Sequence, residues 1–219
     1  MKPNFNTKLF GWFYHTSCRK ELQKRFGINK KYKCIQTEYN RIIGRAKDIG
    51  PSKLMCSYCM GAYFIALYRV MNMPAEECYE IFKDGLYANQ LFHKALGTAD
   101  SYLDPQKLPG RKKWSEESHL NQYENDWIVD ILDQTDTYDL GYDYHQCGIC
   151  KLCADENCFE LAQYLCRFDF VLADIMGMKL ERTMTIAEGA PYCDFRYSRK
   201  EAVSDSPGVS LQHFCETYE

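Results

Sequence analysis

One nearly continuous apolar segment constrains the fold of this chain most strongly. Residues 54–71 read LMCSYCMGAYFIALYRVM, which is apolar on almost every side when it is wound into a helix. A helix on a protein surface keeps a polar face, whereas one that is apolar all round is buried. With Ser52 as a candidate cap, we expect a buried helix that ends near Asn72.

The composition favours a globular chain that binds a small molecule. The 219 residues are 46% hydrophobic and carry a net charge of -3, so we predict no nucleic-acid partner. The longest apolar run, about Met60 to Leu67, is too short to span a membrane, and we predict no membrane partner. No signal peptide is recognised at the N-terminus, so a cytoplasmic protein is expected. Thiols stay reduced there, which makes packing, metal binding or catalysis the expected roles of the twelve cysteines.

Helical patterns come first along the chain, and strand patterns follow. Spacings of apolar residues predict helices over about 5–26 and 35–47 and another that starts near Met73. Residues 127–132 are rich in strand-forming types, and residues 138–145 alternate apolar and polar. We predict an α+β fold, in which an N-terminal helical region packs on a small antiparallel sheet and a buried helix lies in the C-terminal half.

The expected domain organisation is simple. We predict one domain over 1–200, with a helical part over 1–97, a surface loop over 98–120 and an α+β part over 121–200. The loop is predicted because Pro105, Pro109 and Gly110 interrupt a polar stretch. Residues 201–219 are expected to form a poorly ordered tail.

Two groups of cysteines have spacings that occur in metal sites. Cys147, Cys150, Cys153 and Cys158 are separated by two, two and four residues. The last gap and the residue after it differ from ferredoxin runs, and a second pair at zinc spacing is missing. These four are the ligands if any metal binds, but we predict packing, with no metal and no cofactor. Cys56 and Cys59, inside the buried helix, are also interpreted as packing residues.

The most informative segment is a helix expected over about 158–176. At 100° per residue, Asp169 falls on the apolar face, where a carboxylate needs a partner. A strand expected over 180–186 turns Arg182 toward its apolar side, and Asp169 is the predicted partner. The pair is either structural or leaves guanidinium donors for a substrate carboxylate.

A return strand follows the turn at Gly189 and places Cys193 inward and Asp194 outward. If Cys193 lies near Arg182, its thiolate is favoured, as a nucleophile requires. Otherwise Cys193 is a packing residue.

Several short motifs in order resemble the L-2-amino-thiazoline-4-carboxylic acid hydrolase family. They are Cys147-Gly-Ile-Cys150-x-x-Cys153, Leu165-Cys166-x-x-Asp169, Arg182-Thr183-x-Thr185, Ala187-Glu188-Gly189 and Cys193-Asp194-Phe195-Arg196. The helix at Ile65–Tyr68 and the segment Met73–Glu77 add to the likeness, which covers roughly 55–199.

This resemblance implies hydrolytic ring opening of a thiazoline carboxylate, a cyclic amidine, to a carbamoyl-cysteine. The expected site residues fall into two groups. Cys166, Asp169 and Cys193 are the catalytic candidates, with a cysteine as nucleophile or polar anchor and Asp169 as general acid/base. Arg182, Thr185, Asp194 and His145 are the substrate-binding candidates, with His145 also able to serve as a base.

Two other functions compete with hydrolysis. Gly189 followed by Cys193-x-Phe195 also resembles the vinyl-reductase-like domains, which implies a non-enzymatic small-ligand or sensor domain. The second alternative is a cysteine-rich metal-binding protein that uses Cys147 to Cys158.

Overall fold

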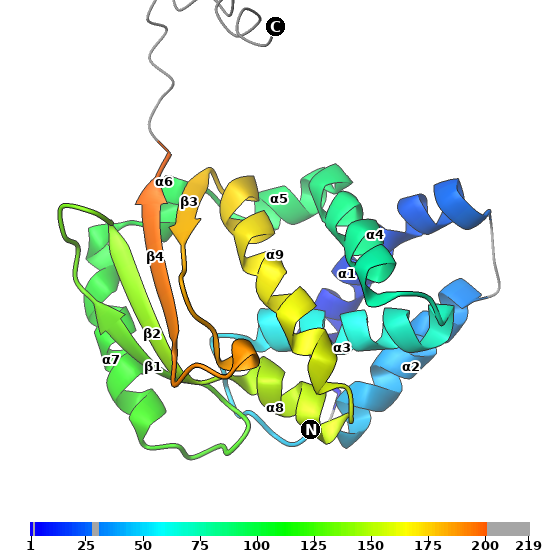
Figure 1. Cartoon of the computed structure of the whole chain (residues 1–219), viewed down its shortest axis with the longest axis horizontal. Coiled ribbons are helices and arrows are strands. Elements are labelled where there is room, and N and C mark those ends of the chain that lie inside the picture. Colours follow the sequence, from blue (N-terminus) through cyan, green and yellow to red (C-terminus); the bar gives the residue numbers. More distant parts are fainter. Residues whose placement is uncertain (2, 28–30, 201–219) are drawn as a thin grey trace, which may run out of the picture.

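The computed structural model describes residues 1, 3–27 and 31–200, and the predicted tail over 201–219 lies outside them. It has the expected α+β fold, with a helical region beside a four-stranded antiparallel sheet (Figure 1). The helices are α1 (Phe5–Phe26), α2 (Lys31–Arg45), α3 (Met55–Met71), α4 (Ala75–Ala88), α5 (Gln90–Leu96), α6 (Ala99–Tyr102), α7 (Leu108–His119), α8 (Gly148–Asp155) and α9 (Ala162–Ile175), with short 3-10 turns η1 (Pro105–Lys107), η2 (Phe159–Leu161) and η3 (Ile186–Glu188).

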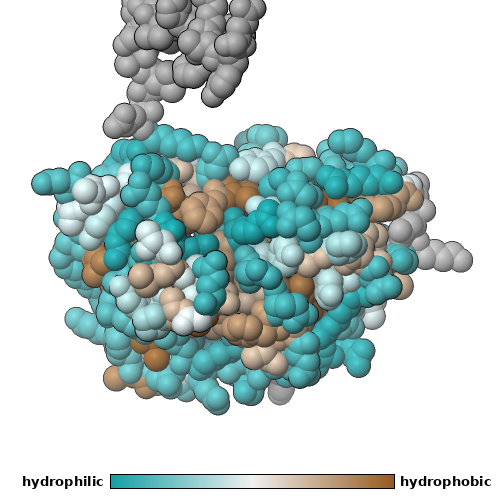
Figure 2. Space-filling model, viewed as in Figure 1, coloured by the Kyte–Doolittle hydropathy of each residue, from teal (hydrophilic) through white to brown (hydrophobic). Residues whose placement is uncertain are grey.

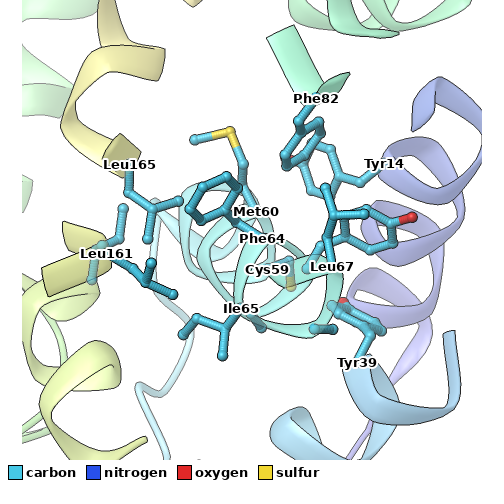
Figure 3. Close-up of a cluster of buried hydrophobic side chains, with 14 of the residues drawn as sticks. Tyr14, Tyr39, Cys59, Met60, Phe64, Ile65, Leu67, Phe82, Leu161 and Leu165 are labelled. Carbon is cyan, nitrogen blue, oxygen red and sulfur yellow. The ribbon is translucent and has the colours of Figure 1, made fainter. Parts of the chain in front are cut away.

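Helix α3 is the buried centre of the helical region, as its apolar sequence predicts. All of residues 58–67 are buried, because α1, α2, α4 and α8 surround the helix. Figure 3 shows aromatic side chains such as Tyr14, Phe64 and Phe82 gathered around it. Close-packed rings of this kind leave little room for water or ligand.

The sheet has the strand order β1-β2-β4-β3, and every pairing is antiparallel. Its strands are β1 (Ile128–Leu132), β2 (Leu140–Gln146), β3 (Met178–Glu181) and β4 (Cys193–Arg199). Helix α7 covers β1, and the Ser118 hydroxyl accepts a hydrogen bond from the Val129 amide at 3.1 Å.

The prediction of a surface loop over 98–120 is wrong. Helices α6 and α7 and the turn η1 occupy most of it. Pro105 and Pro109 were interpreted as helix breakers, but both lie in the first turn of η1 and α7. Proline is tolerated there because the first amides of a helix have no intrahelical partner.

Helix α9 lies between the two parts of the molecule and packs on both β3 and α4 (Figure 1). Two hydrophobic clusters meet near it, one built around α3 and one on the inner face of the sheet. The outer surface in the same view is largely hydrophilic, with scattered hydrophobic patches (Figure 2). Among the described residues, no helix combines the length and hydrophobicity needed to cross a bilayer.

Candidate functional site

A cavity of about 220 Å³ lies where the helical region meets the sheet. Most of its wall is apolar, and it includes side chains from α3, α9, β2 and β4. The groups with acid-base or nucleophilic chemistry in the wall are Lys53, Cys56, Ser57, Tyr102, Tyr144, Cys147, Cys166, Asp169, Cys193 and Tyr197. Apolar cavities with a few polar groups are typical binding sites for small ligands.

Asp169 and Arg182 form the predicted ion pair at this cavity. Arg182 Nη1 donates to Asp169 Oδ2 at 2.6 Å, and Arg182 Nη2 donates to the Cys166 carbonyl oxygen at 3.0 Å. The guanidinium lies 4.9 Å from the ring centres of both Phe170 and Phe195. The Arg182 side chain is only 6% exposed, so its position is fixed by packing as well as by charge.

Burial changes the acidity of Asp169. It raises the pKa of the carboxyl group to about 6, although the neighbouring Arg182 lowers it. The Asp169 side chain is 27% exposed and lines the cavity. A carboxyl group that titrates close to neutral pH and borders a cavity is suited to general acid/base chemistry.

Arg182 stands between this cavity and a second, more open cleft of about 450 Å³. The cleft is lined by Arg182, Thr183, Thr185 and Glu188 on one side and by residues of α9 on the other. Cys166 borders both spaces. The two hydrogen bonds of Arg182 among the described residues use two of its five N–H donors.

The thiols of Cys166 and Cys193 are protonated at neutral pH. Burial raises the pKa of Cys193 to about 11, and Arg182 lowers it by less. Burial also raises the pKa of Cys166, and the Asp169 charge adds to that effect. Arg182 does favour the Cys193 thiolate, as expected, but burial outweighs this effect. Cys193 Sγ accepts a hydrogen bond from the Ile186 amide at 3.1 Å.

Asp194 and Thr185 hold the chain that follows Arg182. Strand β3 ends at Glu181, so the expected strand over 180–186 is wrong from Arg182 onward. The Asp194 carboxylate replaces the strand pairing by accepting hydrogen bonds from the amides of Thr183 and Met184 at 2.9 and 2.8 Å. Thr185 caps η3, and its hydroxyl donates to Glu188 Oε2 at 2.7 Å. Both residues position the segment at the cleft.

His145 does not line either space. It follows Tyr144 on β2 and points to the opposite face of the sheet. There its Nε2 lies 2.8 Å from Asp130 Oδ2, and His119 contacts the other oxygen of the same carboxylate. The sheet separates this surface cluster from the cavity.

Cys147 is not among the catalytic or binding residues predicted from the sequence. The sequence predicts a packing residue, or a ligand if a metal binds, yet Cys147 lines the cavity together with Asp169. The signal was present, since Cys147 directly follows a strand and precedes a short apolar helix. Within the described residues, no group of three or more His, Cys, Asp or Glu side chains is arranged to hold a metal ion.

Comparison with protein families identifies the family of the chain. The model of the family described as L-2-amino-thiazoline-4-carboxylic acid hydrolase matches residues 55–197, about two thirds of the sequence. The matched range includes α3, α8, α9 and most of the sheet, and therefore nearly all of the cavity wall. Comparison with curated proteins found no match.

Proposed function

The chain belongs to the L-2-amino-thiazoline-4-carboxylic acid hydrolase family, and on that basis we propose that it opens the ring of a small cyclic amidine that carries a carboxylate. The observation that carries the proposal is the ion pair of Asp169 and Arg182 at the cavity. Asp169 presents a carboxylate to the cavity and Arg182 presents a guanidinium to the adjoining cleft, so a ligand that lies across the boundary of the two spaces meets both groups. A hydrolase of this substrate class needs both.

The charges of the pair match those of the substrate. A 2-amino-thiazoline carboxylate carries a positive amidine and a negative carboxylate near neutral pH. Asp169 accepts hydrogen bonds from the amidine nitrogens, and the N–H donors of Arg182 that have no partner among the described residues hold the carboxylate. The cavity, at about 220 Å³, has room for a small ring of this kind.

Asp169 supplies the acid/base chemistry in this proposal. Its carboxylate takes a proton from the attacking group and returns it to the ring atom that leaves the amidine carbon. Because the pKa of Asp169 is about 6, the carboxylate form prevails at neutral pH but is easily protonated during the reaction. Arg182 orients the ring and limits how far the pKa of Asp169 rises.

The test is incubation of the folded protein with the thiazoline acid and two parallel readouts. Release of a thiol reports cleavage of the C–S bond, and release of a primary amine reports cleavage of the C–N bond. We expect one of them to rise above the blank and to fall by about 10²-fold or more in Asp169→Asn. Asp174→Asn is the matched control, because Asp174 lies on the exposed side of the same helix. Release of neither product by folded protein contradicts this substrate.

A further inference from the structure

Cys147 occupies a defined position at the junction of a strand and a helix. It directly follows β2 and is the N-cap residue of α8. Gly148 makes the junction possible, since a Cβ atom there would lie 2.7 Å from both the Asn125 carbonyl oxygen and the Trp127 ring. The close approach of Trp127 fixes the first turn of α8 and with it the position of the Cys147 thiol at the cavity.

The environment of Cys147 favours the thiolate. Interaction with the Cys150 thiol and with the backbone amides of Ile149 and Cys150 lowers the pKa of Cys147, although burial opposes that shift. These amides belong to the second and third residues of the helix, whose N–H groups point toward the N-cap. Reactive cysteines in other proteins are commonly activated by helix N-termini in this way.

Cys150 has the opposite tendency. The neighbouring Cys147 raises the pKa of the Cys150 thiol, and burial adds to the increase. Within this pair the thiolate is therefore favoured on Cys147 over Cys150. Cys166 and Cys193, at the same cavity, have raised pKa values.

Cys147 also lies within electrostatic reach of the acid at the cavity. The charge of Asp169 raises the pKa of Cys147, of Cys166 and of Cys193. The cavity thus brings together the Cys147 thiol and the Asp169 carboxyl group, and the ion pair of Asp169 places a guanidinium at the adjoining cleft. A nucleophile beside an acid/base group and an anchoring cation is the arrangement that covalent hydrolysis requires.

We propose that Cys147 is the nucleophile of this cavity and adds as a thiolate to the amidine carbon of the bound ring. This inference rests on the proposed ring opening. The bond between the amidine carbon and the ring sulfur breaks, and Asp169 carries a proton from the amidine nitrogen to the departing sulfur. The product of this step is an isothiourea that joins the opened substrate to Cys147.

Water completes the reaction. Asp169 takes a proton from water, the hydroxide adds to the isothiourea carbon, and the bond from that carbon to Cys147 Sγ breaks. The oxygen remains in the new urea group, the second hydrogen of the water goes to the urea nitrogen, and one proton leaves to solvent. Cys147 returns as a thiolate, held by Cys150 and the first turn of α8. No oxidant or reductant takes part.

The first experiment measures thiol reactivity without any substrate. The native protein is treated with iodoacetamide between pH 5 and 10, and the modified cysteines are identified by peptide mass spectrometry. We expect Cys147 to react before Cys166 and Cys193 and with a lower midpoint pH. Cys34, which is exposed on α2, serves as the reference thiol in the same digest. Cys150→Ala should raise the midpoint of Cys147, whereas Cys153→Ala, on the next turn of α8, should not.

The second experiment measures turnover of the thiazoline acid by Cys147→Ser, after its fold has been checked by circular dichroism. We expect a loss of at least about 10³-fold in kcat/KM. Full turnover by this variant, or a Cys147 that reacts no faster than Cys166 and Cys193, overturns the proposal. If the unmodified chain opens no thiazoline but Cys147 is still the most reactive thiol, the proposed substrate fails and the assignment of the nucleophile stands.

Discussion

Two of the Cys-x-x-Cys pairs in the sequence, Cys56/Cys59 and Cys147/Cys150, have opposite properties. Cys56 and Cys59 lie in α3, at the core of the helical region, whereas Cys147 and Cys150 lie at the start of α8, where that region meets the sheet. Burial raises the pKa of Cys56 and raises that of Cys59 to about 12. The pKa of Cys147 is lowered.

The position of the first cysteine on its helix explains the difference. Cys147 is an N-cap residue, so it lies at the positive end of α8, beside the amides of the first turn. Cys56 is the second residue inside α3, and its sulfur contacts the Tyr14 hydroxyl at 2.8 Å instead. Spacing alone therefore does not identify a reactive pair. The start of the helix has to be located first.

The largest expected effect is a difference in activity between variants of the two cysteine pairs. Cys147→Ser should lower kcat/KM for the thiazoline acid by at least about 10³-fold, because a hydroxyl is a far weaker nucleophile at neutral pH. Cys59→Ala should change it by less than about threefold, because Cys59 is fully buried in the core and does not line the cavity. Equal losses in the two variants would remove the distinction between the pairs.

The next prediction concerns pH. If Asp169 acts as a carboxylate, kcat/KM should rise about tenfold per pH unit up to about pH 6, the pKa of that group, and then level off. The measurement is a pH–rate profile for the wild type and for Asp174→Asn. The control variant should show the same rise of kcat/KM with pH. A profile without a limb near pH 6 would contradict this role of Asp169.

Removal of Arg182 should mainly affect stability at higher pH. Arg182→Met leaves Asp169 without its partner, which should cost about 3–5 kcal/mol at pH 8. Arg182 lowers the pKa of Asp169, so its loss raises that pKa further. A raised carboxyl pKa favours folding at low pH and opposes it as pH rises through the folded pKa, so the cost should be smaller at pH 5.

Urea unfolding at both pH values measures this difference. Arg167→Met is the matched control, because Arg167 pairs with Glu76 at a more exposed position and its loss should cost only about 1 kcal/mol or less. A destabilisation by Arg182→Met that does not change with pH would mean that the ion pair is not the cause.

The smallest expected effect is on stability. Here the variant of the α3 pair should be affected more than the variant of the α8 pair. Cys59→Ala should lower the free energy of unfolding by about 1–2 kcal/mol, because it leaves a void in a filled core. Cys147→Ala should change it by less than about 0.5 kcal/mol, since its side chain is only partly buried and borders a cavity at the edge of the core. If Cys147→Ala is the more destabilising variant, Cys147 is a packing residue.

Periodicity in the sequence predicted the parts of the structure that depend on neighbouring residues along the chain. The apolar surface of α3, the ends of α1 and the inward direction of Asp169 all follow from helical spacing. The pairing of Asp169 with Arg182 could also be predicted, because a buried charge needs an opposite one.

Features that depend on contacts between distant segments could not be predicted in the same way. Asp194 points away from the core, as alternation predicts, but its role in holding Thr183 and Met184 depends on how the chain turns after β3. Cys147 was grouped with Cys158 by metal spacing. Its environment depends on Trp127 and Gly148, which place the start of α8 at the cavity.

The most direct test of a nucleophilic Cys147 is mass spectrometry of the protein quenched with acid during turnover of the thiazoline acid. Ring opening loses no atoms, so we expect an adduct with the mass of the whole substrate on the peptide that contains Cys147. The adduct should be absent from Cys147→Ser and should disappear when the substrate is exhausted. An adduct on Cys166 or Cys193, or turnover by Cys147→Ser, would contradict the account.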